Sequence, residues 1–174
     1  MLVKSFRILV CVVLLAHLST GCSWMNLSAD YDPVLDTQTT QLYQDTETFF
    51  TEVETSIGTQ KFFHSEHQDF YSNAKGRTKA LFTRAELHEE GLASTPLTDN
   101  FENLLMQYEN LEAEHKRQSE KMISVINESG MDAVNTKPYA LYWDSALKGF
   151  QQSFRAIMAH LMVLKGIREE QIMK

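Results

Sequence analysis

The chain has 174 residues, of which 43% are hydrophobic and 22% are charged, and this composition is typical of a folded protein rather than a disordered or fibrous one. Its length predicts a single folded domain. The formal net charge is −7, which argues against a nucleic-acid partner, because polyanions attract basic surfaces.

Residues 1–21 have the organisation of a signal peptide. Lys4 and Arg7 form a basic start, and residues 8–18 form an apolar run that only His17 interrupts. This run is too short to span a bilayer as a stable helix. Removal of residues 1–21 leaves 14 Lys and Arg against 23 Asp and Glu, so we expect a mature chain of net charge −9.

The two cysteines have different expected fates. Cys11 lies in the apolar run and is lost with the signal peptide, so Cys22 is the one cysteine of the expected mature chain. An intramolecular disulfide is then excluded. A free thiol in an oxidising compartment tends to be consumed, and attachment of lipid to Cys22 would account for its presence there.

The stretch Leu18-Ser19-Thr20-Gly21-Cys22 resembles the lipobox of bacterial lipoproteins. In that family a small residue precedes a cysteine that is acylated and becomes the new N-terminus. Thr20 and Gly21 match the preferred small residues, whereas Leu18 stands one place earlier than the usual leucine. The resemblance covers residues 1–22 and implies cleavage between Gly21 and Cys22, with palmitate-type acyl groups on Cys22. The alternative is ordinary signal-peptidase cleavage at the same bond, which would release a soluble periplasmic protein.

The residue after the cysteine bears on the destination of the chain. In lipoproteins of two-membrane bacteria, an aspartate at this position favours retention in the inner membrane, and here the residue is Ser23. The resemblance therefore implies the periplasmic face of the outer membrane, with the bilayer bound through the N-terminal acyl groups. Residues 22–31 lack helical periodicity and would form a tether of at most about 30 Å.

Residues 32–174 are punctuated as a series of helices. Proline is favoured at a helix start and glycine just past a helix end. The expected starts are marked by Pro33, Pro96 and Pro138, and the expected stops by Gly58, Gly91 and Gly130. They predict helices over 33–57, 60–90, 97–129 and 138–172. Short connections favour antiparallel neighbours, so the predicted fold is all-α, an up-down-up-down four-helix bundle.

Apolar residues recur at alternating steps of three and four along each predicted helix, as expected for a face turned toward a core. The predicted face of 97–129 carries Phe101, Leu104, Tyr108, Leu111, His115, Gln118, Met122 and Val125. That of 138–172 carries Trp143, Leu147, Phe150, Phe154, Ile157, Leu161 and Leu164. The weaker faces carry Leu35, Leu42, Phe49 and Val53 in 33–57, and Phe63, Phe70, Ala74 and Leu81 in 60–90.

The histidines raise the question of a metal or haem site, because helical bundles bind such groups between facing helices. His64 and His67 lie one turn apart, and Glu112 and His115 form one Glu-x-x-His spacing, but the second such helix that a di-iron site needs is missing. A Cys-x-x-Cys-His motif for covalent haem is also missing. Noncovalent haem or copper bound by His67, His115 and a methionine is kept as the alternative, and no cofactor is the main expectation.

The expected hairpin between the second and third helices places His67 and His115 in different layers of the bundle. On an otherwise apolar face, His115 and Gln118 are better interpreted as a buried polar layer that fixes the register of the helices. The sequence also lacks a Gly-x-Ser-x-Gly elbow and a phosphate-binding glycine loop, so we expect a protein that is not an enzyme.

Aromatic residues gather at the end of the predicted bundle that lies away from the lipid. They are Phe62, Phe63, Tyr139, Tyr142 and Trp143. An exposed group of this kind, with Phe62, Tyr139, Tyr142 and Trp143 as anchors, would bind a protein partner, since aromatic residues are enriched in interface hot spots. The alternative is that the rings close the end of the core. The sequence thus predicts a membrane-anchored, non-enzymatic envelope lipoprotein that contacts another envelope protein, with a periplasmic metal- or haem-binding bundle as the alternative.

Overall fold

The computed structural model describes residues 31–89 and 96–173, and this part of the chain is all-helical, without a strand. Its four long helices are α2 (Pro33–Ser56), α3 (Gln68–Glu89), α4 (Pro96–Ser129) and α5 (Lys137–Ile172). Three short 3-10 turns, η1 (Gln60–Phe62), η2 (His64–His67) and η3 (Met131–Ala133), lie in the connections. The predicted helical bundle is confirmed. None of the described helices has the length and apolarity needed to cross a membrane.

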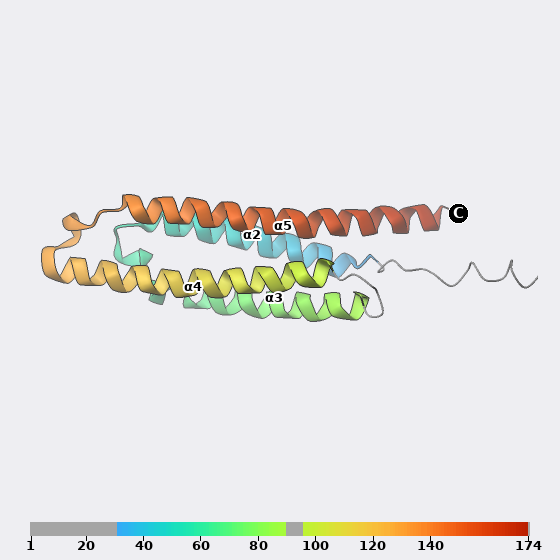
Figure 1. Ribbon diagram of the computed structural model, residues 1–174, viewed down its shortest axis with the longest axis horizontal. Coiled ribbons are helices and arrows are strands. Elements are labelled where there is room, and N and C mark those ends of the chain that lie inside the picture. Colours follow the sequence, from blue (N-terminus) through green and yellow to red (C-terminus); the bar gives the residue numbers. More distant parts are fainter. Residues whose placement is uncertain (1–30, 90–95, 174) are drawn as a thin grey trace, which may run out of the picture.

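Consecutive helices run in opposite directions and pack side by side along their length (Figure 1). The main contacts join α2 to α3, α3 to α4, α4 to α5, and α5 back to α2, so the four helices enclose one core. We call the end of the bundle that contains η1, η2 and η3 the distal end. The start of α2 and the end of α5 lie at the opposite, proximal end (Figure 1).

The helix boundaries follow the local chemistry that the sequence displays. The side chain of Asp32 caps α2 by accepting a hydrogen bond from the backbone N–H of Val34, at 2.8 Å, and Pro33 occupies the first turn. Gly58 follows α2 with a φ of 87°, and Gly130 follows α4 with a φ of 83°. These left-handed conformations favour glycine and reverse the chain after each helix. The predicted stop at Gly91 lies outside the described residues.

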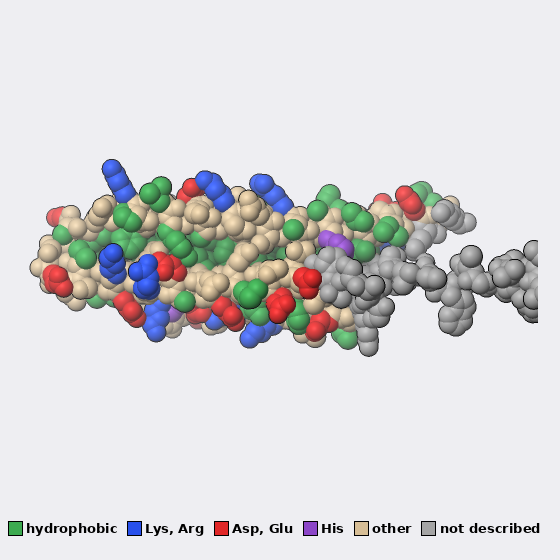
Figure 2. All heavy atoms as spheres, viewed as in Figure 1, with side chains coloured by type: hydrophobic (Ala, Val, Ile, Leu, Met, Phe, Trp, Pro, Cys, Tyr) green, Lys and Arg blue, Asp and Glu red, His purple; other side chains and the backbone are tan. Residues whose placement is uncertain are grey.

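The predicted faces of α2, α4 and α5 form the core. The fully buried large side chains include Leu35, Leu42, Phe50, Phe101, Leu104, Tyr108, Trp143 and Phe154. Burial of a large apolar side chain stabilises the fold by about 1.5–3 kcal/mol, so these faces dominate the stability of the bundle. Between α4 and α5 a strip of hydrophobic surface stays visible toward the distal end (Figure 2).

The predicted helix over 60–90 is wrong in its first eight residues. There the chain forms η1 and η2, and α3 begins only at Gln68. The physical reason is the burial of Phe62, which is 0% exposed: the chain must fold across the distal end of the bundle to bring this ring beneath the core. The face of α3 also differs, because Tyr71 is fully buried while Phe70 is only half-buried.

At the proximal end, Asp32 ties the start of α2 to the last turns of α3. Its buried carboxylate contacts the guanidinium of Arg84 and lies 2.9 Å from Nε2 of His88. Burial by itself raises the pKa of this carboxyl, but the hydrogen bonds from Arg84 and from the N–H of Val34 hold the pKa below its ordinary value. Asp32 therefore acts as a helix cap and as an ionic clamp together.

Replacement of Asp32 by alanine is expected to lower the free energy of unfolding at neutral pH by about 1–2 kcal/mol, because the cap is lost. A carboxyl whose pKa is depressed in the folded state stabilises above its unfolded pKa, so the difference from the parent protein should shrink as the pH falls below about 4. Denaturant titrations at pH 7 and pH 3 measure this difference. The exposed Asp132→Ala is the control, and an equal loss at both pH values would contradict the clamp.

Candidate functional site

Three histidines meet at the distal end of the bundle. The ring of His115, from α4, lies 5.8 Å from the ring of His64 and 5.4 Å from the ring of His67, measured between ring centroids. The prediction that His67 and His115 occupy different layers is therefore wrong. It assumed a continuous helix over 60–90, whereas η1 and η2 bend across the bundle and carry His67 toward α4.

His115 is fully buried and both of its ring nitrogens are hydrogen-bonded. A carbonyl can only accept, so Nε2 must donate to the carbonyl oxygen of Phe62, at 2.6 Å. Nδ1 then accepts from the hydroxyl of Tyr71, at 2.8 Å. Burial lowers the pKa of His115 to about 4, against the opposing effect of the bond to Phe62, and nearby His67 and His64 lower it further. The imidazole is neutral at pH 7.

These hydrogen bonds bear directly on the metal hypothesis. A neutral imidazole has one free nitrogen lone pair, and in His115 this lone pair accepts a hydrogen bond from the hydroxyl of Tyr71. Nε2 of His67 is engaged with the carbonyl oxygen of Lys61, at 2.8 Å. Across residues 31–89 and 96–173, no three His, Cys, Asp or Glu side chains are grouped as metal ligands. The hydrogen bonds of His115 and His67 hold these two rings in the packing of the distal end, whereas Nε2 of His64 is buried without a hydrogen-bond partner and lies 3.5 Å from a carboxylate oxygen of Glu112.

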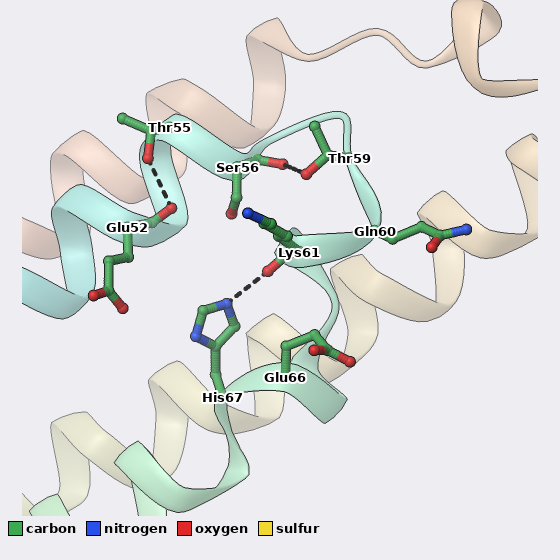
Figure 3. A pocket seen from close by; sticks show the side chains of 8 residues that line it. All are labelled: Glu52, Thr55, Ser56, Thr59, Gln60, Lys61, Glu66 and His67. Carbon is green, nitrogen blue, oxygen red and sulfur yellow. Dashed lines mark hydrogen bonds between the residues drawn. The ribbon is translucent and has the colours of Figure 1, made fainter.

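A polar depression of about 960 Å³ opens beside His67, between the end of α2 and the two 3-10 turns (Figure 3). Apart from buried Ser56 and half-buried His67, the side chains around it are exposed. They are Glu52, Thr55, Thr59, Gln60, Lys61 and Glu66. The hydrogen bonds drawn in Figure 3 all end on nearby backbone carbonyls, so the side chains of Thr55, Thr59 and His67 stabilise the local turns.

The polar layer continues from His115 to Gln118, and its predicted burial is confirmed, since the two residues are 0% and 5% exposed. Oε1 of Gln118 accepts from the indole N–H of Trp143, at 3.0 Å, and its amide N–H donates to Glu114, at 2.8 Å. Glu114 in turn pairs with Arg117 at the surface. The layer thus joins the core of α5 to the surface of α4 through satisfied hydrogen bonds.

The four aromatic residues predicted as partner anchors do converge, but they do not form an exposed patch. Phe62 and Tyr139 lie 5.7 Å apart, and Tyr142 lies 5.7 Å from Trp143, between ring centroids. Phe62, in the chain between α2 and α3, packs against Tyr139 and Trp143, and all three side chains are buried. These three rings close the distal end of the core. Tyr142 is half-buried and is the accessible member of the group.

Tyr142 lies at the centre of a groove between α4 and α5, the strip of hydrophobic surface in Figure 2. Two adjoining depressions share this residue, one of about 420 Å³ toward the distal end and one of about 300 Å³ toward the middle of the bundle. Their apolar lining comprises Leu111, Val125, Ala133, Val134, Pro138, Tyr139, Ala146, Gly149 and Phe150. We call this surface the α4–α5 groove.

The depth of the α4–α5 groove comes from small residues on α5. Ala146 and Gly149 follow Tyr142 at steps of four and three, and so lie on one face of the helix. A Cβ atom built on Gly149 meets no other atom within 4 Å, so the space above it is open. Ala146 and Gly149 were not among the predicted site residues, although their spacing beside the buried face of α5 was a signal for them.

The fold and this surface define the class of the molecule as an all-helical bundle with an open, largely apolar groove between two of its helices. Comparisons with protein families, with curated proteins and with solved structures give no match.

Proposed function

We propose that this protein is a lipid-anchored envelope lipoprotein whose helical domain contacts another envelope protein. In this proposal residues 1–21 are a signal peptide, Cys22 carries the acyl groups, residues 22–31 are the tether, and residues 32–174 are a non-enzymatic up-down-up-down bundle. The observation that carries it is the stretch from Leu18 to Cys22, which follows a basic start and an apolar run.

The arrangement of the bundle supports this proposal. Tyr31, the first described residue, lies at the proximal end, where its carbonyl oxygen accepts from Arg168 of α5 at 3.3 Å. A tether that enters at this end leaves the distal end and the α4–α5 groove turned away from the membrane. Ser23 after the cysteine favours the periplasmic face of the outer membrane, and a soluble periplasmic protein is the alternative outcome.

Replacement of Cys22 by serine is expected to move the protein from the membrane pellet to the soluble fraction, or to leave it as an unprocessed precursor. The multiple acyl chains of a bacterial lipoprotein hold a protein firmly on a bilayer, whereas the acidic domain has little affinity for anionic lipid. Fractionation of intact cells, followed by immunoblotting of pellet and supernatant, measures the change.

The matched control is Cys11→Ser, which alters a cysteine inside the signal peptide and should leave the protein in the pellet. Mass spectrometry of the mature N-terminus decides the chemistry. An unmodified Cys22, or a mature chain that begins at another residue, would remove the lipid anchor from the proposal.

A further inference from the structure

The α4–α5 groove has the dimensions of a helix-binding site. Its lining runs along α4 from Gln107 to Val125, which at 1.5 Å per residue corresponds to about 27 Å, or five turns of a partner helix. Ala146 and Gly149 permit a close approach to the backbone of α5. Tyr142 stands between the two depressions, in the position of an aromatic anchor.

The charges at the rim select the kind of helix. Among the described residues that line the groove, Arg117 and Lys121 are basic and Glu114 is the single acid. Arg117 and Glu114 pair with each other, so Lys121 carries the uncompensated charge among these lining residues. In a chain with 23 acidic and 16 basic residues, a groove whose rim has a net positive charge is complementary to a helix that carries an acidic side chain beside its apolar stripe.

The same charges argue against a second copy of this chain as the occupant. A two-fold dimer formed groove to groove would bring Lys121 of both copies to one interface, and like charges in contact are repulsive. A bilayer does not fit either, because the surface is concave and lies toward the distal end (Figure 2).

We infer that the α4–α5 groove binds an amphipathic helix of another envelope protein, with the apolar stripe of that helix on Tyr142, Ala146 and Gly149 and an acidic residue facing Lys121. The inference rests on the proposed function, in that it names the surface and the partner chemistry for the contact proposed above. Recognition of this kind uses apolar anchors one helical turn apart in the partner.

The experiment places a photoreactive benzoylphenylalanine at position 142 of the full-length protein and irradiates intact cells. We expect a crosslinked product whose partner peptide, identified by mass spectrometry, is an amphipathic segment with acidic residues beside its apolar stripe. A product with twice the mass of this chain, a product with lipid, or the absence of a crosslink from correctly anchored protein would each overturn the inference.

Filling the groove is the companion test. Gly149→Trp should reduce the crosslink from position 142 at least about tenfold, because the new side chain occupies the open space above α5. The control Ala159→Trp adds the same side chain at an exposed position on α5 outside the groove and should leave the crosslink unchanged. Circular dichroism melts of both variants show that the bundle stays folded.

The outcome for the groove is separable from the outcome for the lipid anchor. Crosslinking to an acidic helix from protein recovered in the soluble fraction supports the groove and rejects the anchor. Pelleted, acylated protein in which Gly149→Trp and Ala159→Trp crosslink equally supports the anchor and rejects the groove.

Discussion

Replacement of Trp143 by alanine is expected to lower the free energy of unfolding by about 3–5 kcal/mol, the cost of removing a large aromatic side chain from a packed core. Trp143 is fully buried, and its ring centroid lies 5.7 Å from that of Phe50 and 4.8 Å from that of His115. Truncation also leaves the buried oxygen of Gln118 without its donor. Urea titration monitored by far-ultraviolet circular dichroism measures the loss.

The control for this prediction is Leu141→Ala, two residues away on the same helix. Leu141 is 72% exposed, so its truncation should change the free energy of unfolding by less than about 0.5 kcal/mol. Similar effects of the two substitutions would show that Trp143 is not a core residue.

Acidification from pH 7 to pH 4 is expected to destabilise the protein through His115. The pKa of this histidine is about 4 in the folded state and about 6.5 in the unfolded chain, so between these values the unfolded chain binds a proton that the folded state does not. Stability is thus retained above pH 6.5 and falls as the pH decreases. A pKa shift of this size corresponds to a loss of about 3 kcal/mol in the free energy of unfolding. Unfolding titrations at several pH values measure this loss.

His115→Gln separates the titration from the structure. Glutamine can donate to the carbonyl of Phe62 and accept from Tyr71, yet it does not bind a proton in this range. The variant should lose only the part of the pH dependence of the free energy of unfolding that His115 causes, since His64 and His67 are kept. The control His160→Gln removes a histidine of α5 outside the cluster. An unchanged slope in His115→Gln would contradict the assignment.

The helices and most of the core could be predicted because they depend on local spacing. Phe101 to Met122 in α4, and Trp143 to Leu164 in α5, keep their steps of three and four over many turns, so one face is fixed whatever packs on it. Proline and glycine positions indicated both ends of α2 and α4 and the start of α5 for the same local reason.

The distal end could not be predicted in this way, since its structure depends on contacts between distant segments. Phe62 is buried by Tyr139 and Trp143, about 80 residues away, and this contact replaces the expected helical start of 60–67 with 3-10 turns. The same contact covers Tyr139, whereas Tyr142 stays half-buried. The signal peptide, Cys22 and the tether lie outside the described residues and stay predictions.

The position of the two chain ends has a mechanical consequence. Tyr31 and the end of α5 lie at the proximal end of the bundle. A force that separates them acts perpendicular to the helix axes, so it breaks the contacts between α2 and α5 one turn after another. A force between Tyr31 and a helix seated at Tyr142 instead runs along the long axis. It loads the side-chain contacts of α2 and α5 in parallel, as shear. The bundle should therefore withstand more tension between a membrane and a bound partner than between its own two ends.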